Sequence, residues 1–222
     1  MPPDFRGKIA LITGVGRVGQ IGHAVARGFA EAGARLVIAD MNAAGLAERA
    51  RELTAEGHEV RVAAGDLSTP DAARRAVTVA REQLGGLDVL VNVAGGLVHY
   101  GSALELEPEK FERELTINVK TTFYMSQAAI PALTARGGGA IVNFASVAVL
   151  RPQAQMASYI AAKSAVAGLT RALAREFADA GVRVNAVAPG WVASSGMDQY
   201  DPSFAKEVIP RLTPRGFSTT MS

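Results

Sequence analysis

The chain of 222 residues contains no cysteine, which excludes disulfides, thiolate metal sites and cysteine nucleophiles. No stretch approaches the ~20 consecutive apolar residues of a membrane span, and residues 1–8 lack the apolar core of a signal peptide. Lysine and arginine form no block, so we predict no nucleic-acid or membrane partner. The three histidines, His23, His58 and His99, have no metal-ligand spacing. We therefore expect a cytoplasmic protein without a metal site.

The composition is that of one globular domain. Hydrophobic residues make up 49% of the chain, and 23 basic residues against 21 acidic ones give a formal charge of +2. This length suffices for one substantial core and is marginal for two. We predict a single domain over residues 1–222, in which residues 1–7 form an extension before the first strand.

Short β-branched runs alternate with longer segments rich in Ala, Leu, Arg and Glu, a pattern typical of βαβ units. Most of the short runs are continuously apolar, as strands covered on both faces should be. The sequence predicts an α/β fold: a single Rossmann-type, doubly wound parallel sheet with helices on both faces. The predicted strands are 8–13, 35–39, 60–64, 89–92, 140–145 and 183–187. The predicted helices are 21–32, 43–56, 70–84, 108–134 and 157–179.

A glycine-rich segment follows the first predicted strand. Gly14, Gly16 and Gly19 fit the Gly-x-Gly-x-x-Gly pattern, in which glycines let the backbone approach a pyrophosphate and the N-terminus of the next helix attracts it. The alternative is a flexible strand-to-helix turn. Because strand, glycines, helix and a later acidic residue coincide, we favour a dinucleotide site.

Asp40 ends the second predicted strand, where a carboxylate can bind the adenosine ribose hydroxyls and repel a 2′-phosphate. This favours NAD as the cofactor. NADP remains possible, because Arg17 in the glycine-rich segment offers a cation to a phosphate. The alternative for Asp40 is that it caps the helix beginning near Asn42.

Tyr159 and Lys163 have a Tyr-x-x-x-Lys spacing within a predicted helix, so both side chains project from one face. An ordinary tyrosine titrates near ~10, and a nearby lysine cation lowers its pKa by favouring the phenolate. Ser146 ends an apolar run, which places its hydroxyl at the carboxyl end of a strand, where ligands of open α/β sheets bind. The alternative for the Tyr–Lys pair is a solvated surface pair.

Asn118, Ser146, Tyr159 and Lys163 together resemble the catalytic tetrad of short-chain dehydrogenase/reductases, oxidoreductases that move hydride between NAD(P) and an alcohol or carbonyl. The order of motifs follows that family from residue 8 to about residue 195. The resemblance implies that Tyr159 is the general acid/base, that Ser146 hydrogen-bonds the substrate oxygen and that Lys163 supports the tyrosinate. It also implies that Asn118 distorts its helix and holds a proton-relaying water.

The same resemblance predicts the residues that bind the cofactor. The glycine loop of this chain is two residues longer than is usual in the family, with Val18 and Gln20 at positions where glycines are common. A loop of this length resembles the bacterial enoyl-acyl-carrier-protein reductases of the same superfamily. The predicted cofactor-binding residues are Gly14, Arg17, Gly19, Ile21, Asp40, Asp66, Leu67, Asn92, Ala94, Gly95, Tyr159, Lys163, Pro189, Gly190, Val192 and Ser194.

The resemblance favours a ketoreductase or secondary-alcohol dehydrogenase, closest in general pattern to 3-oxoacyl-carrier-protein reductases. Enoyl-thioester reductases are a weaker alternative, because their spacing would require a tyrosine at position 156, which is Met156. A catalytically idle NAD(P)-binding sensor or scaffold is the alternative from another class. The intact tetrad argues against it.

The carboxyl end differs from the family pattern. Residues 190–222 are predicted to hold the substrate loop and a shortened tail, without the usual last helix and strand. We expect a homodimer or homotetramer, because the family packs the Tyr–Lys helix in a subunit interface and its small residues here, such as Gly168, permit close approach. The short tail predicts impaired activity or tetramer formation.

Overall fold

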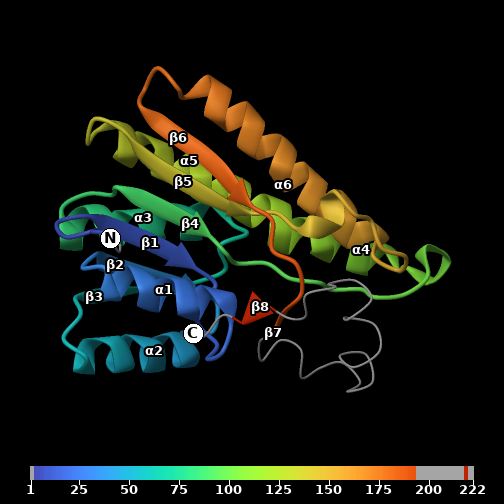
Figure 1. The fold of residues 1–222 in the computed structure, drawn as a ribbon, viewed down its shortest axis with the longest axis horizontal. Helices are drawn as coiled ribbons and strands as arrows, with labels where there is room; N and C mark the ends of the chain where they lie inside the picture. The colour runs from blue at the N-terminus through green and yellow to red at the C-terminus, as the bar shows by residue number, and fades with distance from the viewer. Residues whose placement is uncertain (1–2, 194–217, 220–222) are drawn as a thin grey trace.

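The computed structural model describes residues 3–193 and 218–219. Its main sheet has six parallel strands in the order β3-β2-β1-β4-β5-β6 (Figure 1). Their bounds are β1 Ile9–Thr13, β2 Arg35–Asp40, β3 Val60–Ala64, β4 Val89–Asn92, β5 Gly139–Phe144 and β6 Val182–Val187. The strand order reverses between β1 and β4, and a crevice for a ligand forms at such a switch point. The predicted Rossmann-type sheet is confirmed.

Helices cover both faces of this sheet. Successive residues of β1 point to opposite faces, so Leu11 joins the core cluster beneath α3, α5 and α6, whereas Ile12 joins the cluster beneath α1 and α2. The helix bounds are α1 Ile21–Glu31, α2 Ala43–Ala55, α3 Pro70–Leu84, α4 Pro108–Leu115, α5 Thr121–Thr134 and α6 Ala157–Glu176.

Local sequence signals account for most element ends. Thr69 caps α3 by accepting a hydrogen bond from the backbone N–H of Ala72, and Pro70 follows at the first helical position. Gly85 ends the same helix at φ 88°, a left-handed conformation that is strained for any residue with a Cβ. The predicted strands and helices agree with the structure to within a few residues, with one exception.

The exception is the single helix predicted over residues 108–134. The structure divides it into α4, a π-helical turn over Thr116–Lys120, and α5. The turn contains Asn118, whose side chain takes a backbone acceptor of the helix, as described below. The helix therefore continues in the same direction, but one turn contains one more residue than an α-helical turn does.

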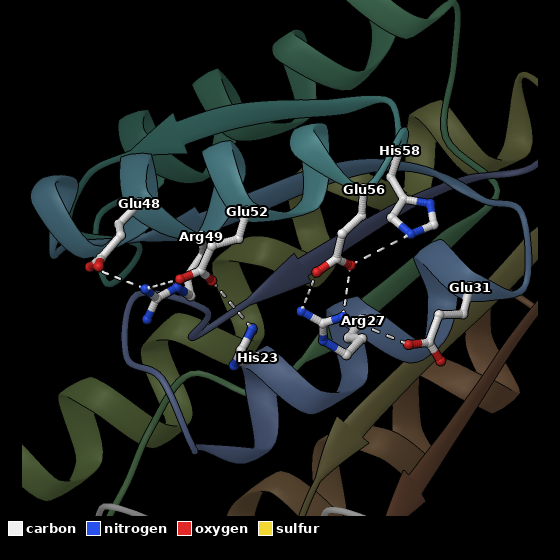
Figure 2. A network of polar contacts seen from close by, with 8 residues as sticks. All are labelled: His23, Arg27, Glu31, Glu48, Arg49, Glu52, Glu56 and His58. Atoms are coloured by element: carbon white, nitrogen blue, oxygen red, sulfur yellow. Dashed lines mark hydrogen bonds and ion pairs between the residues drawn. The ribbon is translucent and has the colours of Figure 1, made fainter.

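Ion pairs fix α2 against α1 (Figure 2). Arg27 of α1 donates two hydrogen bonds, of 2.7 and 3.0 Å, to the carboxylate of Glu56 just beyond α2, and these lower the pKa of that carboxyl. On α2 itself the buried guanidinium of Arg49 contacts Glu52 at 2.6 Å and Glu48 at 3.1 Å. The bonds between Arg27 and Glu56 thereby hold the carboxyl end of α2 against α1.

Two short strands lie outside the main sheet. β7, Val192–Ala193, pairs in parallel with β8, Ser218–Thr219. The sequence did not predict β8. The remainder of the predicted tail, residues 194–217 and 220–222, lies outside the described residues. Within the part of the chain that the structure describes, no helix combines the length and apolar character needed to cross a membrane.

Candidate functional site

A cleft of about 660 Å³ runs along the carboxyl edge of the sheet. Every strand of the main sheet contributes residues to it from the segment at its carboxyl end, and the cleft crosses the switch point between β1 and β4. Its polar or conformationally special lining residues include Gly14, Arg17, Asp40, Asp66, Gly95, Ser146, Tyr159, Lys163 and Gly190.

The glycine-rich segment is packed too closely for side chains at two positions. A Cβ at Gly14 would lie 2.9 Å from the backbone nitrogen of Ala94, and Gly14 also has a φ of 77°. A Cβ at Gly22, in the first turn of α1, would lie 2.1 Å from the carbonyl oxygen of Gly14. These contacts bring the end of β1, the start of α1 and the turn after β4 together at the floor of the cleft.

The first turn of α2 clamps the same segment from the other side. Asp40 accepts hydrogen bonds from the backbone N–H groups of Gly16, at 2.8 Å, and Asn42, at 2.9 Å. Asn42, not Asp40, caps α2, by accepting from Gly45, and its amide also contacts the Gly16 carbonyl at 3.3 Å. A Cβ on Gly45 would lie only 1.9 Å from that carbonyl oxygen.

The start of α1 suits an anionic group. Gln20, at the N-cap position, makes no side-chain capping hydrogen bond, and the first turn contains no acidic residue. The first N–H groups of the helix therefore lack a side-chain partner from their own cap, beside the close-packed glycines. Gln20, Ile21 and the exposed Arg17 all line the cleft, so the residues present fit a dinucleotide pyrophosphate. Gly19 does not line it.

Asp66 and Leu67 follow β3 and line the same end of the cleft. Asp66 accepts hydrogen bonds from the backbone N–H and the hydroxyl of Ser68, whereas Thr69 caps α3. Neither Asp66 nor Ser68, although both could cap a helix by residue type, is thus the N-cap of α3. The side chain of Leu67 is 5% exposed and joins the core beneath α3.

Thr13 organises the turn after β4. Its buried hydroxyl accepts hydrogen bonds from the backbone N–H groups of Val93 and Ala94, both at 3.0 Å, and so ties β1 to the turn. Ala94 and Gly95 line the cleft. Sequence reasoning missed this role of Thr13, although a polar residue closing an apolar strand was its signal.

Asn92 does not line the cleft and instead belongs to a buried chain of polar side chains. Its amide donates to the side-chain oxygen of Asn143 at 2.9 Å and to Ser126 at 3.1 Å. Asn143, on β5, in turn donates to Thr170 of α6 at 3.0 Å. These bonds join β4, β5, α5 and α6, so Asn92 positions the central strands from within the core.

Asn118 is fully buried in the π-helical turn. Its amide nitrogen donates to the backbone oxygens of Glu114 and Gly96, both at 2.9 Å, and its side-chain oxygen accepts from Gly96 N–H at 3.1 Å. The Glu114 oxygen is the acceptor that an α-helix would give to the backbone N–H of Asn118. This substitution accounts for the wider turn and ties it to the loop after β4.

Ser146, Tyr159 and Lys163 meet at the cleft. Ser146 follows β5, is 7% exposed, and accepts a hydrogen bond from Ala148 N–H at 3.2 Å. Lys163, one turn beyond Tyr159 on α6, donates to the Phe144 carbonyl at 2.9 Å and lies 5.7 Å from the centre of the Tyr159 ring. The spacing read from the sequence therefore brings cation and phenol together.

The Lys163 ammonium is a buried charge. Its side chain is 5% exposed, and burial lowers the pKa of Lys163 to about 8, whereas the charge of Glu114 raises it. Glu114 itself is fully buried on α4, and burial raises the pKa of its carboxyl. No sequence pattern points to Glu114, because it stands in a run of charged residues that is typical of a solvated helix face.

The segment after β6 completes the cleft with Pro189, Gly190, Trp191 and Val192. Val147 N–H donates to the Pro189 carbonyl at 3.0 Å, which joins this segment to the one after β5. Ser194, predicted as a further cofactor contact, lies outside the described residues. Within the described chain, no three His, Asp or Glu side chains form a group that could hold a metal ion.

Known proteins share this architecture over almost the whole chain. The sequence profile of the short chain dehydrogenase family matches residues 8–204. A cyclohexanol dehydrogenase from an Acinetobacter species is 35% identical over 210 residues, which are 95% of this chain and 83% of the relative. A 2,5-dichloro-2,5-cyclohexadiene-1,4-diol dehydrogenase from Sphingobium indicum is 42% identical over 219 residues, covering 96% of this chain and 84% of the relative.

Solved structures agree with these relatives. A 7α-hydroxysteroid dehydrogenase complexed with NADH and 7-oxo glycochenodeoxycholic acid has a TM-score of 0.90 at 29% identity, covering 98% of this chain and 84% of that one. An L-sorbose reductase from Gluconobacter frateurii, complexed with NADPH and L-sorbose, also has a TM-score of 0.90 at 29% identity, covering 99% and 88%.

The chain belongs to the short-chain dehydrogenase family. It is an NAD(P)-dependent oxidoreductase that acts between alcohols and carbonyl compounds.

Proposed function

We propose that this protein oxidises a secondary alcohol, and reduces the corresponding ketone, with Tyr159 as the general acid/base. The observation that carries the proposal is the buried Lys163 ammonium, 5.7 Å from the centre of the Tyr159 ring, in the same cleft as the Ser146 hydroxyl. A positive charge beside a phenol lowers its pKa toward the range where it exchanges protons at neutral pH.

Each member of the group has a role in this proposal. Tyr159 accepts the hydroxyl proton of the alcohol during oxidation and returns a proton to the carbonyl oxygen during reduction. Ser146 hydrogen-bonds the same oxygen while its charge changes. Asn118 fixes the loop after β4 through Gly96. The nicotinamide ring, when bound, supplies the hydride acceptor or donor.

We propose NAD as the preferred cofactor. Asp40 stands at the end of β2 in the cleft, and its two bonds to Gly16 and Asn42 leave acceptor sites for ribose hydroxyls. A carboxylate there repels the 2′-phosphate of NADP. The residues proposed to hold the dinucleotide are those of the lining: Gly14, Arg17, Ile21, Asp40, Asp66, Leu67, Ala94, Gly95, Tyr159, Lys163, Pro189, Gly190 and Val192.

Cyclic secondary alcohols are the first substrates to test. Two relatives, the cyclohexanol dehydrogenase and the dichlorocyclohexadienediol dehydrogenase, are named for six-membered carbocyclic alcohols. The cleft near Tyr159 is walled by apolar side chains that suit such a ring, including those of Leu97, Val98, Met156 and Trp191.

A kinetic comparison tests the role of Tyr159. Purified protein is assayed with NAD and NADP against cyclohexanol, linear secondary alcohols and sugar alcohols, by the absorbance of the reduced cofactor. We expect turnover with NAD, and a loss of about 10²–10⁴-fold in kcat in Tyr159→Phe, the range for a lost general acid/base, with unchanged NADH affinity by fluorescence titration.

Tyr124→Phe is the matched control, because Tyr124 is a half-buried tyrosine on α5 outside the cleft lining. It should retain wild-type kcat. Undiminished hydride transfer in Tyr159→Phe would contradict the assigned role. Tight NADH binding without turnover on any alcohol or ketone would instead favour a nucleotide-sensing function.

We also propose that the protein is a homo-oligomer built on α6. The exposed Ala161 and the half-buried Gly168 belong to one small-residue face of this helix, and a Cβ at Gly168 would meet no atom within 4 Å. Small residues of this kind let a second helix approach closely, which supports a homodimer across α6.

A further inference from the structure

Glu114 is the most deeply buried carboxylate of the described chain, with no exposed surface. One of its oxygens accepts hydrogen bonds from Val98 N–H at 3.0 Å, His99 N–H at 3.2 Å and the Ser158 hydroxyl at 3.2 Å. Its other oxygen accepts from Val98 N–H at 3.1 Å and faces the Asn118 amide at 3.4 Å. No part of the proposed reaction described so far uses this residue.

These contacts connect three parts of the cleft. Val98 lines the cleft from the loop after β4, Ser158 directly precedes Tyr159 on α6, and Asn118 lies one turn beyond Glu114. A single carboxylate thus joins the substrate-facing loop to the helix that carries the phenol and the ammonium. Buried carboxylates are rare unless paired or hydrogen-bonded, and the donors on Val98, His99 and Ser158 offset the burial of this one.

The charge of Lys163 adds to these hydrogen bonds in favouring the charged carboxylate. Among the groups packed around Glu114, Ser158 and Asn118 are uncharged, and the His99 ring is directed to the Ser102 carbonyl at 3.4 Å. Among the described residues, the charges of Lys163 and Glu114 act on each other across the interior without a direct ion pair between them. Tyr159, the titratable group beside Lys163, lies one turn earlier on α6 and directly follows Ser158.

We infer that Glu114 is a positioning residue of the reaction: its carboxylate holds the loop after β4 against the start of α6 and keeps the Lys163 ammonium charged beside Tyr159. The inference rests on the proposed function of Tyr159 and extends it to a residue outside the tetrad. It assigns a purpose to a buried charge that costs folding free energy.

The direction of the effect follows from the charges. Removing the negative charge of Glu114 lowers the pKa of Lys163 further, because burial then acts unopposed. A lysine that becomes neutral no longer stabilises the phenolate, so the pKa of Tyr159 rises. Alcohol oxidation, which needs the phenolate, then requires a higher pH.

The test compares Glu114→Gln with Glu114→Asp, which retains the charge, and with Glu112→Gln, which removes an exposed carboxylate of the same helix. The first readout is an NMR titration of the Lys163 side chain in lysine-labelled apoprotein, with the signal assigned by its loss in Lys163→Arg. We expect the Lys163 pKa to fall by about one pH unit in Glu114→Gln and to stay near the wild-type value in the other two variants.

The second readout is the pH profile of kcat/KM for alcohol oxidation. Its acidic limb should move up by about one pH unit in Glu114→Gln, which lowers the rate about tenfold on that limb. Glu114→Asp should keep the wild-type limb but raise KM, because a shorter carboxylate loses contact with the loop. Glu112→Gln should match wild type in both.

A Lys163 signal that titrates at the wild-type pH in folded Glu114→Gln would overturn the inference, and so would a rate loss that is equal at every pH. If Glu114→Gln does not fold, a Lys163 pKa in Glu114→Asp that falls well below the wild-type value has the same force. The NMR titration needs no substrate, so it tests the effect of Glu114 on Lys163 independently of activity. A protein without alcohol dehydrogenase activity would refute the proposed function alone.

Discussion

A buried lysine reduces the stability of the folded state, because its ammonium loses contact with water, and Lys163 is such a residue. Folding transfers its ammonium from water to a site where the Phe144 carbonyl, at 2.9 Å, is its hydrogen-bond acceptor. Burial lowers the pKa of Lys163 to about 8, so the buried side chain binds its proton less tightly than an exposed lysine does. At this position the ammonium lies 5.7 Å from the centre of the Tyr159 ring.

The same pKa predicts how stability depends on pH. Between pH 8 and the ordinary lysine pKa of about 10.5, the unfolded chain binds more protons at Lys163 than the folded protein does, so the free energy of unfolding rises with pH. Urea unfolding of wild type, compared with Lys163→Met, should show this as an excess slope of up to about 1.4 kcal/mol per pH unit.

Lys120→Met, which changes an exposed side chain, should keep the wild-type pH dependence. Equal slopes for wild type and Lys163→Met over this pH range would show that Lys163 titrates as an exposed lysine does. That result would contradict the buried charge on which the Tyr159 assignment depends.

Sequence reasoning performed unevenly at single residues. Tyr159, Lys163 and Ser146 carry their signals in local spacing and strand ends, and the structure brings all three to one cleft. Glu114 carries none, because its burial depends on the loop after β4 folding over α4, a contact between residues 98 and 114 that no local pattern encodes. Asn118 is intermediate: the family resemblance implied that it distorts its helix, and the structure shows that distortion as a π-helical turn, a form that the local sequence does not specify.

At the scale of elements, the contact between α2 and the glycine-rich segment determines the shape of the cofactor site. The Gly16 carbonyl approaches Gly45 so closely that no side chain fits between the start of α2 and the loop. Arg27 and Glu56 hold the other end of α2 against α1 (Figure 2). The conformation of the glycine-rich segment therefore depends on the packing of α2 as well as on its own glycines.

Gly45→Ala tests this contact. Its Cβ would lie 1.9 Å from the Gly16 carbonyl oxygen, so we expect a loss of about 1–3 kcal/mol in the free energy of unfolding, as for overpacking. Displacement of the loop should weaken NADH binding about tenfold, equivalent to about 1.4 kcal/mol. Urea unfolding and fluorescence titration with NADH measure the two effects.

Gly28→Ala is the matched control. Gly28 is an exposed helical glycine of α1 whose Cβ would meet no atom within 4 Å, so alanine there should stabilise the protein by about 0.5–1 kcal/mol without changing NADH affinity. If both variants bind NADH as wild type does, α2 does not shape the loop.

The elements themselves were largely predictable, because buried parallel strands are short apolar runs and their helices end at glycines. β3 and β4 have the predicted bounds, and α3 matches at both ends. The failures share one cause. The division of residues 108–134 and the pairing of β7 with β8 arise from hydrogen bonds between distant segments, at Asn118 and at Val192, which a local pattern does not contain.

At the scale of the whole molecule, α6 has two tasks, since its inner face carries Tyr159 and Lys163 and its outer face is proposed to meet a second subunit. We expect Gly168→Arg to raise the dissociation constant of the oligomer at least about tenfold, because the new side chain occupies the space between the helices. Sedimentation velocity at several concentrations measures the change, and NADH titration reports whether each subunit keeps its cofactor site.

Gly28→Arg places the same side chain on α1, away from α6, and should assemble as wild type does. An unchanged assembly in Gly168→Arg would place the subunit contact on another face. Loss of NADH binding together with dissociation would instead mean that the second subunit supports the cleft itself.

The buried pair Asn92 and Asn143 has a consequence for how the chain folds. β4 and β5 are mostly apolar around these residues, and a slip of one residue between them would turn every side chain of one strand to the opposite face of the sheet. In the native register Asn92 stands opposite Asn143, and their amides bond at 2.9 Å. A slipped pairing would separate the two amides, at about 1–3 kcal/mol for each buried polar group left unsatisfied. The hydrogen bond between these two uncharged side chains therefore favours the native register of β4 and β5 over shifted registers, and so helps to select the correct sheet during folding.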